Sequence, residues 1–321
     1  MFGGKILKNK KIIITGGAGF IGSNIARTLF EDNEIIILDN FLSGRLKNIT
    51  DLVEDNFISF VSGSIMDKEL LKKTFKNADY IFHLAAIPSI SESIEDPFHT
   101  SEINVAGTIN ILYASLMNDI KKVIFASSAA IYGNMVDVPN KENMIPYPTS
   151  PYAIQKLSGE HYCRIFYEIY GLPTTSLRYY NVYGPNQNPY SDYAAVIPKF
   201  INNVIKNESP IIFGDGNQTR DFIFVQDIVE ANLLAAENKA SNGKSINIAT
   251  GKAISIGGLA QEIISTAAKT IRPKYVKARK GDIRHSLGDV SLAKEILGFE
   301  AKCSLKKGLS ETIWWLDNER R

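Results

Sequence analysis

The chain has 321 residues, of which 45% are hydrophobic and 22% are charged, and its formal net charge is +2. This composition is typical of a folded globular protein and excludes a chain that is mainly disordered. A charge so near zero also argues against nucleic-acid binding through a general basic field. Cys163 and Cys303 are too far apart for a disulfide framework or a metal-ligand cluster, and no apolar run approaches the roughly 18 residues of a membrane span. We therefore expect a cytoplasmic protein with no metal, no nucleic acid and no membrane as its partner.

Short apolar runs without alternation recur up to Tyr179, and they predict strands that are buried on both faces of a parallel sheet. The predicted strands cover residues 11–15, 34–39, 57–61, 80–84, 123–127 and 174–179. Amphipathic stretches between them predict helices over residues 23–30, 68–75, 104–117 and 151–170. This alternation predicts an α/β fold with a doubly wound, Rossmann-type parallel sheet.

The chain changes character after Tyr183, where turn-rich segments such as Gly214-Asp215-Gly216 interrupt the alternation. Strand-like runs at 222–225 and 245–249 are expected to return to the edge of the sheet. We therefore predict a large domain over residues 1–184, to which residues 222–250 return. A smaller, interleaved C-terminal lobe is predicted over residues 185–221 and 251–321.

A glycine-rich segment follows the first predicted strand and begins a helix. It contains Gly16, Gly19 and Gly22, whose spacing allows a tight turn, close approach of a pyrophosphate to backbone amides, and close packing of the helix. The next strand ends at Asp39, where a carboxylate accepts hydrogen bonds from an adenosine ribose. A plain glycine-rich turn is the alternative. Asp39 favours a dinucleotide site, and it favours NAD over NADP because a 2′-phosphate would face the carboxylate.

Tyr152 and Lys156 are four residues apart at the start of the predicted helix 151–170, and Ser150 is its expected N-cap. The cation and the positive helix end are expected to lower the pKa of Tyr152 from about 10 towards the working pH, which makes it a candidate general base. Ser128 follows a predicted strand, at the sheet edge where α/β proteins bind ligands, and is a candidate proton relay. The alternatives are a core tyrosine beside a solvated lysine, and a serine that only satisfies backbone groups.

Together these features resemble the extended short-chain dehydrogenase/reductase family, and the resemblance covers nearly the whole chain. Further segments resemble its NAD-dependent nucleotide-sugar epimerase branch, especially UDP-glucose (UDP-galactose) 4-epimerases and UDP-N-acetylglucosamine 4-epimerases. These segments include His83-Leu84-Ala85-Ala86, Arg178-Tyr179-Tyr180-Asn181 and Arg220-Asp221-Phe222. The resemblance implies that the large domain binds NAD and that the smaller lobe binds a UDP-sugar.

The resemblance also implies roles for individual residues. Ser128, Tyr152 and Lys156 match the catalytic triad of the family. Besides Tyr152 and Lys156, cofactor contacts are implied for Gly16, Gly19, Phe20, Ile21, Gly22, Asp39, Asn40, Ser43, Gly44, Ile65, Leu84, Ala85, Ala86 and Asn104. Substrate contacts are implied for Ser89, Ser128, Tyr152, Asn181, Arg220, Arg279, Asp282 and Ser286. Arginine suits phosphate oxygens, but a surface ion pair is the alternative for each arginine, and a turn role is the alternative for Ser89.

Two positions depart from the pattern of the family. Ser64 stands where many relatives have an aspartate that contacts adenine, which affects the affinity for the cofactor rather than its identity. Ala129 and Ala130 follow Ser128, where dehydratases of this branch have an acidic pair and decarboxylases keep an acidic residue. A dehydratase needs an acidic residue at this place to protonate the leaving hydroxyl group, and this chain has none there. The resemblance therefore favours epimerisation.

The resemblance therefore implies an isomerase, a 4-epimerase that interconverts UDP-glucose and UDP-galactose through a transient 4-keto intermediate. UDP-GlcNAc and UDP-GalNAc are expected as further substrates, because Ser286 leaves room for a 2-acetamido group. The alternatives are a nucleotide-sugar dehydratase, decarboxylase or reductase on the same scaffold, and a non-catalytic NAD-binding sensor. Relatives commonly dimerise through the helices that match 104–117 and 151–170, so a homodimer is expected unless Tyr162, Phe166, Tyr167 and Tyr170 are buried within the monomer.

Overall fold

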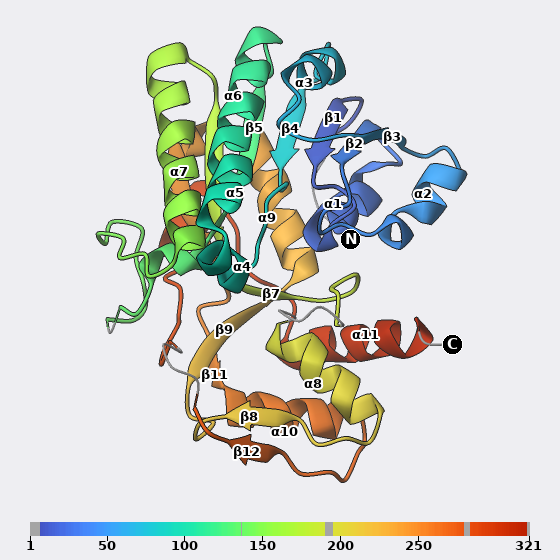
Figure 1. Ribbon diagram of the computed structural model, residues 1–321, viewed down its shortest axis with the longest axis vertical. Helices are drawn as coiled ribbons and strands as arrows, with labels where there is room; N and C mark the ends of the chain where they lie inside the picture. Colours follow the sequence, from blue (N-terminus) through green and yellow to red (C-terminus); the bar gives the residue numbers. More distant parts are fainter. Residues whose placement is uncertain (1–6, 136, 190–194, 279–282, 320–321) are drawn as a thin grey trace.

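A seven-stranded parallel sheet forms the centre of the molecule in the computed structural model, which describes residues 7–135, 137–189, 195–278 and 283–319 (Figure 1). Its strand order is β10-β6-β5-β4-β1-β2-β3, and every neighbouring pair is parallel. The strands are β1 (Lys11–Thr15), β2 (Glu34–Asp39), β3 (Ser59–Ser62), β4 (Tyr80–His83), β5 (Lys122–Ser128), β6 (Thr174–Tyr179) and β10 (Lys244–Ile248). The predicted Rossmann-type α/β fold is confirmed.

Helices cover both faces of this sheet. One face packs against α1 (Phe20–Leu29) and α9 (Val225–Glu237), and the other against α3 (Lys68–Thr74), α6 (Gly107–Met117) and α7 (Pro151–Tyr170). Ile12 and Ile14 of β1 lie in the hydrophobic cluster of the first face, whereas Ile13 lies in that of the second. Since both sets of side chains are buried, the strands are apolar without alternation, as the sequence indicated.

A smaller lobe lies beside the sheet and is built from later parts of the chain (Figure 1). Its strands are β7 (Asn181–Tyr183), β9 (Thr219–Phe224) and β11 (Ala253–Ser255), which form one sheet, and β8 (Ile211–Phe213) and β12 (Lys274–Val276), which form another. Three helices pack into its core: α8 (Val196–Ile205), α10 (Ile256–Thr266) and α11 (Leu305–Asn318).

The expectation that residues 222–225 return to the edge of the large sheet was wrong. Those residues belong to the end of β9 and the start of α9, and β9 pairs with β7 and β11 instead. The expectation for residues 245–249 was close, because β10 pairs with β6 at the edge of the large sheet. An apolar run predicts a buried strand but does not say which of two sheets it joins. The boundaries of the two lobes remain a prediction.

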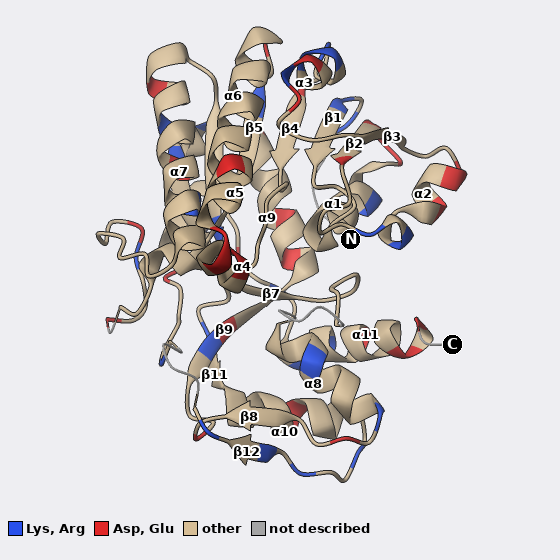
Figure 2. Ribbon diagram, viewed as in Figure 1, with Lys and Arg blue, Asp and Glu red and all other residues tan. Residues whose placement is uncertain are grey.

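Short elements complete the chain. They are the helices α2 (Thr50–Glu54), α4 (Ile90–Glu95) and α5 (Pro97–Ser101), the 3₁₀ turns Leu46–Asn48, Ala129–Tyr132 and Lys239–Ser241, and the π-helical turns Glu102–Ala106 and Ala293–Leu297. The predicted helix 104–117 is therefore π-helical at its start. Within the described part of the chain, no helix is both long and apolar enough to cross a membrane. Figure 2 shows charges of both signs spread over the outer elements, with acidic residues on α2 and basic residues on α3.

The helix α7 has the same bounds as predicted, because both of its ends are encoded locally. Ser150 is its N-cap, whose Oγ accepts a hydrogen bond from the N–H of Ala153 at 3.2 Å, and Pro151 occupies its first position. Gly171 ends it in the left-handed conformation, with φ of 75°. These caps fix where Tyr152 lies along the helix.

Lys122, at the start of β5, gives a pH-dependent contribution to stability. Its side chain is buried, and Nζ donates to the carbonyl of Asn238 at 2.7 Å and to Ser241 Oγ at 2.9 Å. Burial lowers the pKa of Lys122 to about 7 in the folded protein, against about 10.4 in an unfolded chain. The unfolded chain therefore binds more protons than the folded protein above pH 7, and this residue makes the free energy of unfolding rise with pH.

We expect the Lys122→Met variant to lack that rise. Between pH 7 and pH 9 the free energy of unfolding of the parent should rise by about 2 kcal/mol more than that of the variant, because methionine does not titrate. Urea unfolding of both proteins at several pH values measures this difference. A difference that does not change with pH would show that Lys122 keeps an ordinary pKa.

Candidate active site

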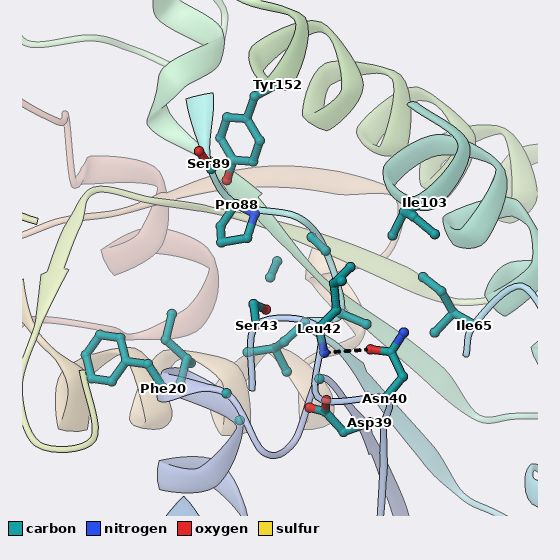
Figure 3. A pocket seen from close by; sticks show the side chains of 18 of the residues that line it. Phe20, Asp39, Asn40, Leu42, Ser43, Ile65, Pro88, Ser89, Ile103 and Tyr152 are labelled. Carbon is teal, nitrogen blue, oxygen red and sulfur yellow. Dashed lines mark hydrogen bonds between the residues drawn. The ribbon is translucent and has the colours of Figure 1, made fainter. Parts of the chain in front are cut away.

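A cavity with a volume of ≈ 620 Å³ lies where β1, β2, β4 and β5 end. Parallel strands bring their carboxyl ends to one edge of a sheet, so the loops that follow them meet around this space. Figure 3 shows Tyr152 and Ser89 close together at one end of the cavity and Asp39 and Asn40 at the other. The predicted cofactor residues in its lining are Gly16, Gly19, Phe20, Ile21, Gly22, Asp39, Asn40, Ser43, Ile65, Leu84, Ala85, Ala86, Tyr152 and Lys156.

The glycines between β1 and α1 differ in what surrounds them. Gly16 has φ of +70°, and a Cβ there would lie 2.6 Å from the amide nitrogen of Ala85. A Cβ on Gly22 would lie 2.5 Å from the carbonyl oxygen of Gly16. Gly19 is the N-cap of α1, and a Cβ there would meet only the Gly16 carbonyl, at 3.0 Å. Gly16 and Gly22 thus shape the turn, whereas Gly19 leaves room at the helix N-terminus that lines the cavity.

Asp39, at the end of β2, is held in place by the backbone. Its Oδ2 accepts a hydrogen bond from the N–H of Ala18 at 3.0 Å, and its Oδ1 accepts one from the N–H of Phe41 at 2.7 Å. Burial raises the pKa of Asp39, and these backbone hydrogen bonds oppose that shift. Each carboxylate oxygen has a further lone pair, so Asp39 can still accept hydrogen bonds from ribose hydroxyls.

These features fit a dinucleotide. The open N-terminus of α1 provides backbone amides and positive potential for a pyrophosphate. Asp39 lines the same cavity at the end of β2, the place in a Rossmann-type fold where a carboxylate accepts hydrogen bonds from an adenosine ribose. Gln187 supplies one more group, because it lines the cavity and its buried Oε1 has no hydrogen-bond partner among the described residues. Its Nε2 donates to the carbonyl of Val182 at 3.1 Å, which leaves Oε1 available to a bound donor.

Replacing Gly19 by alanine tests the glycine loop. The added methyl group would occupy space beside the helix N-terminus, so we expect NAD to bind about ten- to a hundredfold more weakly, the equivalent of about 1.5–3 kcal/mol for one hydrogen bond to a charged group. The unfolding temperature without added NAD should change little, since the only close contact is at 3.0 Å. Gly22→Ala is the contrasting variant, because its methyl group clashes with backbone and should destabilise the fold. Calorimetric titration with NAD gives the affinities, and equal affinity in Gly19→Ala and the parent would contradict the assignment.

Two predicted cofactor residues lie outside the cavity lining. A Cβ on Gly44 would lie 2.8 Å from Asp39 Oδ2, so Gly44 packs behind that carboxylate. Asn104 is buried and its amide is committed elsewhere: Oδ1 accepts from the N–H of Ile87 at 2.8 Å, and Nδ2 donates to the Ile87 carbonyl at 3.0 Å and to Gln155 Oε1 at 2.7 Å. Asn104 therefore positions the loop after β4, which lines the cavity.

Tyr152 and Lys156 line one end of the cavity, and Ser128 lies beside Tyr152 but outside the lining. Tyr152 lies in the first turn of α7, and Lys156 Nζ is 5.9 Å from the centre of its ring. Nζ of Lys156 also donates to the carbonyl of Ala126 at 2.7 Å, which anchors the lysine to β5. Ser128 ends β5, and its Oγ accepts from the N–H of Ala130 at 3.1 Å.

The expectation that the pKa of Tyr152 is lowered was wrong for the protein without bound ligands. Burial raises its pKa to about 12, and a hydrogen bond with Ser128 opposes that shift only in part. Burial also lowers the pKa of Lys156 to about 8. The sequence predicted the cation beside the phenol but not how completely both groups are removed from water, and desolvation favours their neutral forms.

The predicted substrate residues lie in two places. Ser89 lines the cavity and also caps α4, because its Oγ accepts from the N–H of Glu92 at 3.0 Å. The others gather around β9: Asn181 Nδ2 donates to the Asp221 carbonyl at 2.8 Å, Arg220 Nη1 donates to the Thr219 carbonyl at 2.9 Å, and the N–H of Ser286 donates to that same carbonyl at 3.1 Å. Arg279 and Asp282 lie outside the described residues.

A buried polar network, which the sequence did not predict, connects α7 with β5, β6 and the turn that follows β5. Glu160 lies one turn beyond Lys156 on α7, and its carboxylate accepts a hydrogen bond from Ser127 Oγ. Arg178 of β6 forms an ion pair with the same carboxylate, with Nη2 2.8 Å from Oε2. Arg178 also donates to the hydroxyl of Tyr132 at 2.8 Å. These residues are far apart in sequence, so no spacing signal reveals that they meet.

The chain belongs to the NAD dependent epimerase/dehydratase family, whose model matches residues 12–249. NAD is the cofactor, and solved structures of similar proteins contain it. A putative UDP-glucose 4-epimerase of Methanocaldococcus jannaschii is 42% identical over 313 residues, which are 97% of this chain and 99% of that protein. The solved UDP-N-acetylglucosamine 4-epimerase of Methanobrevibacter ruminantium, in complex with UDP-N-acetylmuramic acid, has a TM-score of 0.94 and 41% identity, covering 98% of this chain and all of that one (100%).

Relatives with another activity are also similar. A UDP-N-acetyl-α-D-glucosaminuronate decarboxylase of Bacillus cytotoxicus is 36% identical over 318 residues, which are 95% of this chain and 97% of that protein. The comparisons therefore establish the family, the fold and the cofactor, and they support an epimerase as the kind of enzyme.

Proposed function

We propose that the protein is an NAD-dependent UDP-hexose 4-epimerase that interconverts UDP-glucose and UDP-galactose and also accepts UDP-GlcNAc and UDP-GalNAc. The observation that carries this proposal is that Tyr152 and Lys156, with Ser128 beside Tyr152, line one end of the cavity whose lining also includes the glycine loop and Asp39. The 4-epimerases among the similar proteins support it.

NAD, held by the glycine loop and Asp39, would supply the redox chemistry, namely a hydride acceptor for C4 of the sugar and a hydride donor to its opposite face. The residues of the chain move the proton. In its ionised form, which burial opposes and Lys156 favours, Tyr152 removes the proton of the 4-hydroxyl, directly or through Ser128, and returns it when the alcohol is formed again. Lys156 is anchored to Ala126 with its charge near the phenol ring, where it stabilises the phenolate that forms.

Ala129 and Ala130 favour this proposal over a dehydratase or a decarboxylase. They follow Ser128 in the turn after β5 and carry no group that titrates. Product analysis distinguishes the reactions: a panel of UDP-hexoses should give only the C4 epimers. A 4-keto-6-deoxy sugar, a pentose or a reduced sugar would contradict the proposal, and bound NAD without turnover of any nucleotide sugar would favour a sensor.

Ser286 is proposed to set the breadth of substrates. Its backbone is bonded to Thr219, next to Arg220, so it belongs to the predicted substrate region around β9. We expect Ser286→Tyr to reduce kcat/KM for UDP-GlcNAc by about tenfold or more relative to UDP-glucose, because a large ring removes room for the acetamido group. Activity of the parent and the variant on both sugars measures this ratio. An unchanged ratio would refute the role of Ser286.

The proposed assembly is a homodimer formed through α6 and α7. Large apolar side chains stand exposed along these neighbouring helices: Tyr113 57%, Met117 55%, Ile154 54%, Tyr162 38% and Tyr170 54%. Figure 1 shows the two helices side by side at one edge of the molecule. An apolar surface of this kind is typical of a protein interface. A solution mass near twice 35.6 kDa is expected, and a mass of one chain would exclude the dimer.

A further inference from the structure

Glu92 is a charged residue of the cavity that the proposed reaction does not use. It lies on α4 and lines the same cavity as Ser89 and Tyr152. Its N–H donates to Ser89 Oγ at 3.0 Å, while Oγ of the next residue, Ser93, accepts from the N–H of Tyr152 at 3.1 Å. The first hydrogen bond caps α4, and the second ties α4 to the first turn of α7. Glu92 is therefore held at the end of the cavity where Tyr152 lies.

The carboxylate of Glu92 brings a negative charge to that end, and no ion pair within the described residues holds it. The described lining has three charged side chains: Asp39, Glu92 and Lys156. Asp39 lies at the far end, as Figure 3 shows. Lys156 lies at the same end as Tyr152, but its Nζ is directed to the carbonyl of Ala126 and forms no ion pair with Glu92. Within the described part of the chain, the carboxylate of Glu92 takes part in no ion pair and no hydrogen bond. The partly buried carboxylate of Glu92 can therefore accept a hydrogen bond from a ligand in the cavity.

We propose that Glu92 is a specificity-determining residue that selects uncharged UDP-hexoses against UDP-hexuronic acids. The inference rests on the proposed function, since it places C4 of the sugar beside Tyr152. In a hexuronic acid the carboxylate is attached to C5, the neighbour of C4, so it lies near Tyr152 and at the same end as Glu92. Two carboxylates there repel each other in a medium of lower dielectric than water. A neutral hydroxymethyl group at that place donates a hydrogen bond to Glu92 instead.

The test compares the binding of UDP-glucose and UDP-glucuronic acid to the NAD-loaded protein by calorimetry. We expect the parent to bind UDP-glucose at least about tenfold more tightly, a ratio equivalent to one close like-charge contact near the surface. Glu92→Gln should reduce this ratio by about tenfold, mainly by tighter binding of UDP-glucuronic acid. Glu92→Asp, which keeps the charge, should retain most of the discrimination. Higher salt should narrow the ratio in the parent but not in Glu92→Gln.

Glu95→Gln is the matched control, because Glu95 is on the same helix, is exposed and lies outside the cavity lining. It should leave the ratio unchanged. Equal affinity of the parent for both ligands, or the same ratio in Glu92→Gln and the parent, would overturn the inference while leaving epimerase activity intact. A parent that neither binds nor converts a neutral UDP-hexose would overturn the proposed function, and this inference with it.

Discussion

Replacing Tyr152 by phenylalanine is expected to lower kcat for UDP-galactose by at least about 10²–10⁴-fold, the range for loss of a general acid or base. The phenol lines the cavity together with Lys156, and a hydrogen bond with Ser128 acts on its hydroxyl. Phenylalanine keeps the ring and removes only the hydroxyl, so packing against the cavity should be retained. The rate of UDP-glucose formation measures the loss.

The matched control for this variant is Tyr147→Phe, since Tyr147 is 69% exposed and lies outside the cavity lining. It should keep the activity of the parent. Both variants should bind NAD with similar affinity, which separates a loss of chemistry from a loss of the cofactor. Activity near that of the parent in Tyr152→Phe would remove Tyr152 from the mechanism.

The largest loss of stability is expected from Glu160→Ala. Arg178 and Glu160 have only 6% and 4% of their side chains exposed, and the substitution leaves the guanidinium buried without its partner. Breaking a buried ion pair on one side costs about 3–5 kcal/mol. Ser127 also loses its acceptor, and it lies beside Ser128 at the end of β5. Urea unfolding should show this decrease in the free energy of unfolding.

An exposed ion pair on the same helix provides the comparison. Arg164 and Glu168 are 47% and 49% exposed, and Nη1 lies 2.6 Å from Oε2. Arg164→Ala should change stability by less than about 1 kcal/mol, because exposed pairs contribute little. If Glu160→Ala costs no more than Arg164→Ala, the buried network does not stabilise the fold.

Much of the fold could be predicted because its signals are local. The bounds of β1, β2, β6 and α7 match the predicted ranges, since apolar runs and end caps are encoded within each segment. Residues 222–225 show the limit: both sheets bury their strands, so an apolar run does not decide between them. The start of the predicted helix 104–117 is a π-helical turn, which follows from packing rather than from a sequence signal.

Part of the candidate site could be predicted because its signals are also local. The glycine loop, Asp39 and the Tyr152–Lys156 pair have fixed spacing, and the structure brings them around one cavity. The pKa of Tyr152 could not be predicted, because it depends on how far tertiary packing removes the phenol from water. Gln187, Glu160 and Glu92 were missed because the cavity or the polar network to which each belongs is built from segments distant in the chain.

The most direct test of the central claim is to incubate the protein with UDP-galactose that carries deuterium at C4 of the sugar and to identify the product. Epimerisation with a cofactor that stays bound predicts UDP-glucose with the deuterium retained at C4 and no net formation of NADH. Loss of the deuterium to solvent, NADH formed in proportion to product, or a 4-keto-6-deoxy product would contradict a 4-epimerase.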